Sequence, residues 1–140
     1  MQSVKKAYDL IGADWDNVRS RQRSWLSLFE EYFKENDVVL DAGCGNAINA
    51  CAIAGKVKDL YAVDFSATQV AIAKQNLSNS PNARVLQASI GSLPFTNGFF
   101  DVVCCFAVLH HLNELEQRKA FSELRRVIAK NGLLFISVWN

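Results

Sequence analysis

The sequence predicts an α/β protein with a doubly wound parallel sheet, in which helices cover both faces of the strands. Apolar, strand-like runs alternate with helical segments along the 140 residues, without a repeat or a linker. The first run, residues 38–40, ends in Asp41 and opens into a glycine-rich turn, and the second, residues 60–63, ends in Asp64. Right-handed helical crossovers join such strands, so both acids lie at the carboxyl edge of the sheet, where ligands bind.

The glycine turn after the first strand indicates a nucleotide-type binding site. Gly43 and Gly45 are spaced by one residue, and glycine lets the backbone approach a ligand where any side chain would block it. Asp64 lies nineteen residues after Gly45. In doubly wound folds an acid about 20 residues past the glycine turn accepts hydrogen bonds from the two ribose hydroxyls of a nucleoside. Gly43, Gly45 and Asp64 therefore form one predicted site.

Helical periodicity and turn residues divide the rest of the chain. Ser66 is the expected N-cap of one helix, and Asn113 with Glu116 resembles a capping box that starts a long helix. Residues 92–98 are rich in turn residues and suit a loop that covers a site at the strand ends. The expected helices span 25–33, 47–54 and 66–77, with a long one from 113 closed by residues 131–132, and the further strands span 83–88, 101–106 and 133–138.

Length and composition predict a single domain, with N-terminal cap helices over residues 1–36 and the core over 37–140. Half of the residues are hydrophobic, which is enough to bury a real core at this length. The net charge of +1 argues against bulk electrostatic binding to nucleic acid or membrane, although it leaves room for a local basic patch.

We expect no membrane segment and a cytoplasmic location. The first six residues have no apolar segment behind their charges. The longest uncharged apolar run, residues 102–109, is far short of the roughly 20 residues that a membrane span requires.

The four cysteines are predicted to be buried thiols, and no metal site is expected. They contain no C-x-x-C pair, and neighbouring residues of a strand such as Cys104 and Cys105 point to opposite faces. Free cysteine is among the residues most often buried.

The spacing of the glycine turn favours one cofactor. A dinucleotide site has the pattern G-x-G-x-x-G, and here the last position is Ile48. The observed D-x-G-x-G pattern resembles motif I of the class I S-adenosylmethionine (SAM) methyltransferases, a resemblance that extends over nearly the whole chain. It implies a Rossmann-like core and SAM as cofactor, with S-adenosylhomocysteine as product. It also implies that Asp41 orients the methionine part of SAM, that the glycines pass beneath it and that Asp64 holds the ribose.

The same resemblance extends the expected cofactor site to Phe65, Ser89, Ile90 and Phe106, and it shows departures from the family. Ala47 replaces a third glycine of the turn. Ser89 stands where these enzymes commonly carry an acid that accepts a hydrogen bond from the adenine amine, and a neutral acceptor is weaker than a carboxylate.

The architecture after the last expected strand also departs from the family. Class I methyltransferases usually continue into a further helix and an antiparallel strand pair, which this sequence lacks after residues 133–138. An apolar strand left at a sheet edge presents unpaired backbone groups. We therefore expect either that this is a truncated product, or that a partner or a second copy of the chain covers this edge.

Further motifs narrow the resemblance to a subfamily. They are Tyr8-Asp9-Leu10-Ile11-Gly12-x-x-Trp15, Arg19, Leu93-Pro94-Phe95, Phe100-Asp101 and, above all, Ala107-Val108-Leu109-His110-His111-Leu112. These residues look like those of the eukaryotic and archaeal enzymes that methylate a carboxymethyl group on the wobble uridine of tRNA. The resemblance implies formation of a methyl ester, tRNA as substrate and a small zinc-binding activator protein as partner.

Few catalytic side chains are expected for this chemistry. A carboxylate acceptor is already ionised at neutral pH, so placing its oxygen in line with the methyl group does most of the work. Arg19 is a candidate bidentate clamp for a carboxylate, or else a solvated arginine beside Arg21 and Arg23. His111 is the preferred site residue of the histidine pair, and His110 then shapes the turn.

Two other functions remain open at this point. One is methylation of a small molecule of the quinone-precursor type, because the same core with an L-P-F loop recurs there. The other is a non-catalytic subunit with the SAM-binding fold, suggested by Ala47, Ser89 and the lacking strand pair. A basic rim of Lys5, Lys6, Arg19, Arg21 and Arg23 favours tRNA, although nearby acids dilute it.

Overall fold

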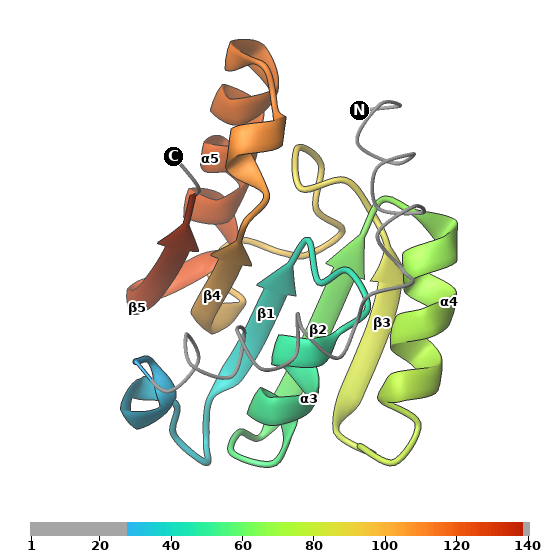
Figure 1. Ribbon diagram of the computed structural model, residues 1–140. Coiled ribbons are helices and arrows are strands. Elements are labelled where there is room, and N and C mark those ends of the chain that lie inside the picture. Colours follow the sequence, from blue (N-terminus) through green and yellow to red (C-terminus); the bar gives the residue numbers. More distant parts are fainter. Residues whose placement is uncertain (1–27, 139–140) are drawn as a thin grey trace.

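The computed structural model describes residues 28–138 and contains a five-stranded sheet whose neighbouring strands are all parallel (Figure 1). The strand order is β3-β2-β1-β4-β5. The strands are β1 (Val38–Ala42), β2 (Asp59–Asp64), β3 (Ala83–Gln87), β4 (Phe100–Phe106) and β5 (Ile128–Ser137). The order reverses direction between β1 and β4, which is the switch point of a doubly wound sheet. The predicted fold class is thus confirmed, and residues 28–138 contain no antiparallel strand pair in this sheet.

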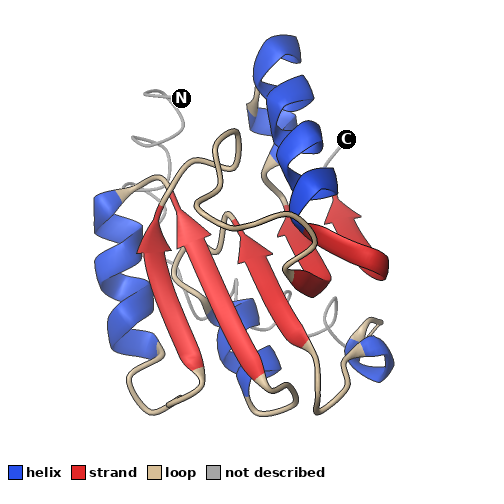
Figure 2. Cartoon of the chain, turned by 180° about the vertical axis from the view of Figure 1, so that it is seen from behind, coloured by secondary structure: helices blue, strands red, loops and turns tan. Residues whose placement is uncertain are grey.

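Helices lie on both faces of the sheet. Helices α3 (Ile48–Ala54) and α4 (Ala67–Asn76) cover one face, and α5 (Glu114–Val127) lies on the other, together with the loop between β3 and β4 (Figures 1 and 2). The predicted caps are present: the Ser66 side chain accepts from Gln69 N, and Asn113 and Glu116 form a complete capping box.

Two apolar clusters sandwich the sheet, as the alternation of a strand requires. In β1, Val39 belongs to the cluster under α3 and α4, whereas Leu40 belongs to the cluster under α5. Cys104 and Cys105 divide between the two clusters in the same way, as predicted. Both faces of the central strands are therefore closed, and ligands can approach only along the strand ends.

The prediction of a helix over residues 25–33 is wrong for residues 28–33, the part that the structure describes. Only a short 3-10 helix, Glu30–Tyr32, forms there, and Leu28 is 68% exposed. Phe29 and Phe33 pack on the ring of Phe135 in β5, at centroid distances of 4.7 and 6.2 Å. The chain turns to place these aromatic rings on the sheet, and burial of the rings outweighs the helical period. Trp25 and the predicted cap helices before it lie outside the described residues.

The boundary between α5 and β5 also differs from the prediction. The helix ends at Val127, and Ile128 already pairs with Phe100, before a register shift that brings Leu133 opposite Val102. Asn131 has a left-handed φ of 68°, and a Cβ on Gly132 would lie 2.9 Å from two backbone oxygens. Residues 131–132 therefore form an irregularity within the strand rather than a helix C-cap, because only glycine fits against the neighbouring backbone.

Strand β5 is an edge strand with an apolar surface, as predicted. Leu133 and Leu134 are 41% and 37% exposed, and Val138, which directly follows the strand, is 54% exposed. Within residues 28–138 β5 pairs with β4 alone. Across that same stretch, the helices are too short or too polar for one of them to span a membrane.

Candidate functional site

The glycine turn after β1 is fastened to the end of β2 through its backbone. The N–H groups of Gly43 and Cys44 both donate to the carbonyl oxygen of Val63, at 2.8 Å each. Gly43 and Gly45 have φ angles of +77° and +54°, in the left-handed region that favours glycine. The backbone groups of the turn itself therefore make these bonds to β2.

The two glycines serve different purposes. A Cβ on Gly43 would collide with the side chain of Val108, whereas a Cβ on Gly45 would meet no atom within 4 Å. Gly43 is thus required by packing against the segment that follows β4. Gly45 leaves open space above its backbone, which is what a closely approaching ligand needs.

Asp64, at the tip of β2, joins this turn directly. Its Oδ2 accepts from Gly45 N at 3.0 Å and its Oδ1 accepts from Ser66 N at 2.9 Å. Burial raises the pKa of the Asp64 carboxyl, and these two backbone hydrogen bonds oppose that effect. A carboxylate oxygen can accept more than one hydrogen bond, so both oxygens keep capacity for the hydroxyls of a ribose.

Asp41, at the end of β1, is buried without a hydrogen-bond partner for its Oδ2 atom. Burial, and secondarily the charge of Asp64, raise the pKa of Asp41 to about 7. Buried polar atoms without partners are rare in native proteins and call for an explanation. The α-ammonium group of SAM would satisfy this acceptor, so these residues fit the implied cofactor.

The structure brings together four of the predicted cofactor residues: Asp41, Gly43, Gly45 and Asp64 all lie at the carboxyl ends of β1 and β2. Phe65 follows directly and is half-buried, and its carbonyl oxygen accepts from Gln87 Nε2 at 3.0 Å. Phe106 ends β4, and its ring stacks on Phe29 at a centroid distance of 5.7 Å.

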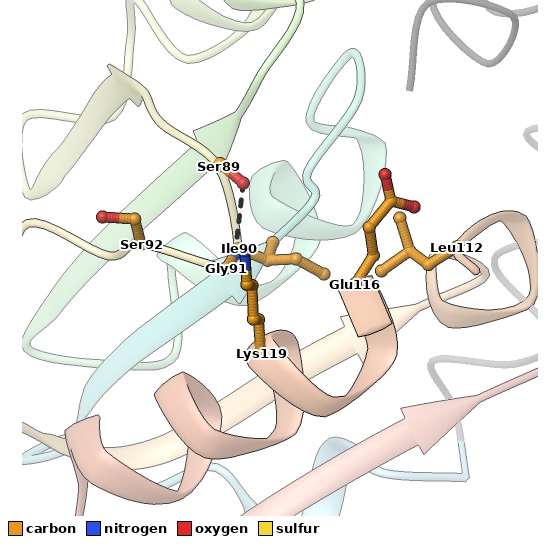
Figure 3. Close-up of a pocket in the computed structure, with 7 residues that line it drawn as sticks. All are labelled: Ser89, Ile90, Gly91, Ser92, Leu112, Glu116 and Lys119. Atoms are coloured by element: carbon orange, nitrogen blue, oxygen red, sulfur yellow. Dashed lines mark hydrogen bonds between the residues drawn. The ribbon is translucent and has the colours of Figure 1, made fainter. Parts of the chain in front are cut away.

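Ser89 and Ile90 line a separate cavity of about 260 Å³ between the loop after β3 and the start of α5. In Figure 3, Leu112 and Glu116 stand on one side of this cavity and Ser89 on the other, with Lys119 rising from α5 between them. Sequence reasoning missed Glu116 and Lys119 as site candidates. The sequence indicates Glu116 only as the capping residue of α5, and the packing of α5 against the loop is what brings it to the wall of this cavity.

The histidine pair lies on a 3-10 helix, Leu109–His111, just beyond β4. The two rings are 4.0 Å apart between centroids. Partial burial, and then the neighbouring His110, lower the pKa of His111. Gln117 of α5 donates to the carbonyl oxygens of Leu109 and Leu112, both at 3.0 Å, and so holds this turn in place. The roles assigned to His111 and Arg19 remain predictions, and Arg19 lies outside the described residues.

The L-P-F loop is fastened to α5 by an ion pair that the sequence analysis missed. Arg126 donates to the carbonyl oxygens of Phe95 and Leu93, at 2.6 and 3.0 Å. Glu123, which pairs with Arg126 at 2.8 Å, accepts from Leu93 N at 2.7 Å. The spacing of three residues on one helix face is the available signal, but sequence alone does not show that this pair points at the loop.

Three of the four cysteines are buried, as predicted, and the fourth is not. Cys51 is exposed, because it lies on the outer side of the short helix α3 and not against the sheet. Burial, and then Asp41, raise the pKa of Cys105 to about 12, so this thiol stays protonated at neutral pH.

Comparison with known proteins agrees with this site. Residues 40–136 match the family model of the methyltransferase domain. The tRNA (carboxymethyluridine(34)-5-O)-methyltransferase of Arabidopsis thaliana is 31% identical over 138 residues, which are 97% of this chain and 32% of that protein. A Mycobacterium tuberculosis protein described as a probable S-adenosylmethionine-dependent methyltransferase is 37% identical over 102 residues, 73% of this chain and 35% of that protein.

A solved structure shows the same fold. In the complex of a Haloferax volcanii methyltransferase with the Trm112 methyltransferase activator, the matching chain has a TM-score of 0.78 at 20% identity, over 94% of this chain and 59% of that one. The chain described here spans about a third of the length of the two relatives named above. The strand order, the glycine turn joined to Asp64 and the match over residues 40–136 lead to one conclusion: the chain belongs to the methyltransferase domain family of class I SAM-dependent methyltransferases.

Proposed function

We propose that this domain uses SAM to methylate a carboxymethyl group on the wobble uridine of tRNA. The observation that carries the proposal is the 31% identity over 97% of the chain to a tRNA carboxymethyluridine methyltransferase, combined with a cofactor edge whose geometry fits SAM. The identity supports the choice of acceptor, and the geometry supports the choice of cofactor.

The described residues would hold the cofactor through three features. Asp64, already oriented by two backbone donors, would accept hydrogen bonds from the ribose hydroxyls. The open space over Gly45 would let the cofactor lie close to the backbone of the turn. The unpartnered Oδ2 of Asp41 would accept from the α-ammonium group. When bound, SAM supplies a methyl group on a positively charged sulfur, which becomes a neutral thioether when the lone pair of a nucleophile takes the methyl.

The acceptor needs positioning more than activation. A carboxylate has no proton to lose at neutral pH, so the protein needs no general base. His111 lies just beyond the end of β4, and its lowered pKa keeps the imidazole neutral and able to donate a hydrogen bond at neutral pH. We propose His111 as the residue that orients the acceptor, and Arg19 as a clamp for its carboxylate.

A small-molecule acceptor is the alternative, and one observation favours it. Four of the cations in residues 28–138 form ion pairs with carboxylates, namely Lys56, Arg84, Arg118 and Arg126. These pairs leave less positive charge for the phosphates of a nucleic acid. The proposed basic rim at the N-terminus lies outside the described residues.

The apolar edge of β5 supports a further part of the proposal, a protein partner. An exposed edge with Leu133 and Leu134 on opposite faces offers both backbone groups and apolar side chains for association. A structural neighbour was solved with the Trm112 activator. We propose that either a small zinc-binding activator of this kind or a second copy of the chain covers an exposed surface of the domain.

Calorimetric titration with SAM tests the cofactor site. The proposal expects micromolar binding that is lost in Asp64→Ala and kept in Asp59→Ala, a variant at the opposite end of the same strand, where the carboxylate pairs with Arg84 at the surface. Equal binding by all three proteins would place the cofactor elsewhere, and no binding by any of them would favour a non-catalytic or partner-dependent domain.

Transfer of a labelled methyl group then separates the acceptors. Labelling of tRNA that carries carboxymethyluridine, with binding that weakens steeply as salt increases, is the expected result. Labelling of quinone precursors without labelling of tRNA would establish the small-molecule alternative.

A further inference from the structure

The segment between β4 and α5 carries both histidines and rises above the carboxyl edge of the sheet (Figure 1). At its start, Ala107 N donates to the backbone oxygen and to the hydroxyl oxygen of Ser137, at 3.0 Å each. Leu109, at 3% exposure, anchors the segment in the apolar cluster under α5. His111 itself is exposed, so packing of its own ring does little to fix it, and its position follows from the backbone that carries it.

That backbone is a 3-10 helix of three residues, which holds itself weakly. Its two internal hydrogen bonds, from His111 N to Val108 O and from Leu112 N to Leu109 O, are both 3.1 Å long. A 3-10 helix has poorer hydrogen-bond geometry than an α-helix and rarely runs beyond about four residues. The helix therefore needs support from outside if the exposed histidine is to keep one position.

Gln117 of α5 supplies such support with a single amide group. Its Nε2 atom donates to Leu109 O and to Leu112 O, at 3.0 Å each, and these two residues flank the histidine pair. The amide nitrogen has two hydrogens, and both are used here. Gln117 is half-buried, on a helix whose N-terminus is closed by a complete capping box, so the donor group is itself held in place. One side chain thus ties both ends of the histidine turn, residues 109–112, to α5.

We propose that Gln117 is a positioning residue that holds His111 against the methyl acceptor. Gln117 touches no reacting group in this assignment. It fixes the histidine turn, and His111 then donates a hydrogen bond to the acceptor from a constant position, which aligns the acceptor with the methyl group. The inference rests on the proposed function, because it requires His111 to orient the acceptor. The alternative is that the two hydrogen bonds of Gln117 serve only the stability of the domain.

Methyl transfer in a double-mutant cycle tests this assignment, with the full chain and tRNA that carries carboxymethyluridine. Gln117→Met removes both donors but keeps a side chain of similar length and high helix propensity. It should lower kcat/KM for the tRNA roughly tenfold, and His111→Ala should lower it by a similar factor. In the His111→Ala background, Gln117→Met should cause little further loss, because the two residues then act on one and the same interaction.

Two measurements that do not depend on turnover accompany the cycle. Calorimetry with S-adenosylhomocysteine should give Gln117→Met the affinity of the unmodified chain, because the glycine turn is fastened to β2 by its own backbone. NMR titration of the His111 ring in Gln117→Met should show its pKa rising toward the ordinary value, since partial burial and then His110 lower it in the ordered turn. Gln75→Met is the matched control: Gln75 is exposed near the end of α4, and all three quantities should stay unchanged.

The outcomes separate the inference from the proposed function. If the losses of Gln117→Met and His111→Ala add in full, or if Gln117→Met weakens S-adenosylhomocysteine binding as much as turnover, Gln117 supports the domain and not His111, and the inference is overturned. An unchanged titration of His111 in Gln117→Met also overturns it. If the unmodified chain binds S-adenosylhomocysteine but labels no tRNA, the proposed acceptor itself is wrong and the inference falls with it, while the cofactor site stands.

Discussion

The glycine turn at residues 43–47 and the L-P-F loop at residues 93–97 are held in place by different parts of the chain. In the turn, backbone N–H groups donate to Val63 O and to Asp64, and most of the contacts are made by main-chain atoms. In the loop, backbone atoms of residues 93–97 are bound by two side chains of α5, Glu123 and Arg126. The turn therefore depends on residue size and backbone angle, and the loop depends on two charged side chains thirty residues away in sequence.

Because of this difference, substitutions in the two regions should act through different physical effects. A substitution in the turn acts through steric collision or burial of charge, which are large effects in a closely packed interior. A substitution at the loop anchor acts through partly exposed polar groups, whose effects are smaller and more local. The four predictions that follow test the turn, the strand ends beside it and the loop, beginning with the largest expected effect.

Asp41→Asn should remove most of the pH dependence of stability. Burial and Asp64 raise the pKa of Asp41 from its ordinary 3.8 to about 7 in the folded protein. Between these values the unfolded chain releases the proton that the folded protein keeps, so this group lowers stability by on the order of 4 kcal/mol as pH rises from about 4 to 7, with no further loss above. Urea denaturation at several pH values in this range measures how the free energy of unfolding changes with pH in the two proteins. Parallel curves for the two proteins would show that Asp41 is ionised in the folded state.

Gly43→Ala should destabilise the domain by about 3 kcal/mol, because its Cβ collides with Val108 and its φ is +77°. Gly45→Ala is the matched change without a collision, and it should cost about 1 kcal/mol for its backbone angle alone. Denaturant midpoints measure both. Val108→Ala in combination with Gly43→Ala should restore part of the loss, and a double variant no more stable than Gly43→Ala would contradict the packing explanation.

Arg126→Met should loosen the L-P-F loop while leaving the glycine turn in place. It removes the donors to Phe95 O and Leu93 O but keeps an aliphatic side chain on α5. We expect a melting temperature lower by several degrees and faster hydrogen exchange confined to residues 93–98. Arg118→Met removes an exposed pair with Glu114 and should change neither. Exchange that also speeds up in residues 43–47 would show that the two regions are coupled.

Ala107→Gly should stabilise the domain by about 0.5–1 kcal/mol, the smallest of these effects. Ala107 has a left-handed φ of 56°, which alanine adopts at a cost and glycine does not. Ala47 has a similar φ of 69° but is fully buried, so Ala47→Gly also loses about 0.8 kcal/mol of buried methyl group and should be close to neutral. Chemical denaturation of both variants tests the comparison, and an equal gain in the two would show that burial of the Ala47 methyl contributes nothing.

Local patterns in the sequence are enough to predict the sheet and the cofactor edge. Apolar runs ending in Asp41 and Asp64 place both acids at the strand ends, because residues that follow parallel strands meet at one edge. The caps at Ser66 and Asn113 are also local, since a side chain bonds a backbone group only three residues away. Local features such as these are fixed by neighbouring residues and do not depend on the rest of the fold.

What only the tertiary structure decided involves residues distant in sequence. Aromatic packing on Phe135 replaced the expected helix before β1, and the close backbone at Gly132 turned an expected helix end into an irregular strand. The anchoring of the L-P-F loop by Arg126 and the second side of the cavity at Glu116 likewise arise because α5 packs beside a loop about thirty residues earlier. The sequence by itself determined the class of fold and the edge that binds the cofactor, because strand ends and caps are local. The partners of each side chain across that edge were decided by packing, which no short pattern encodes.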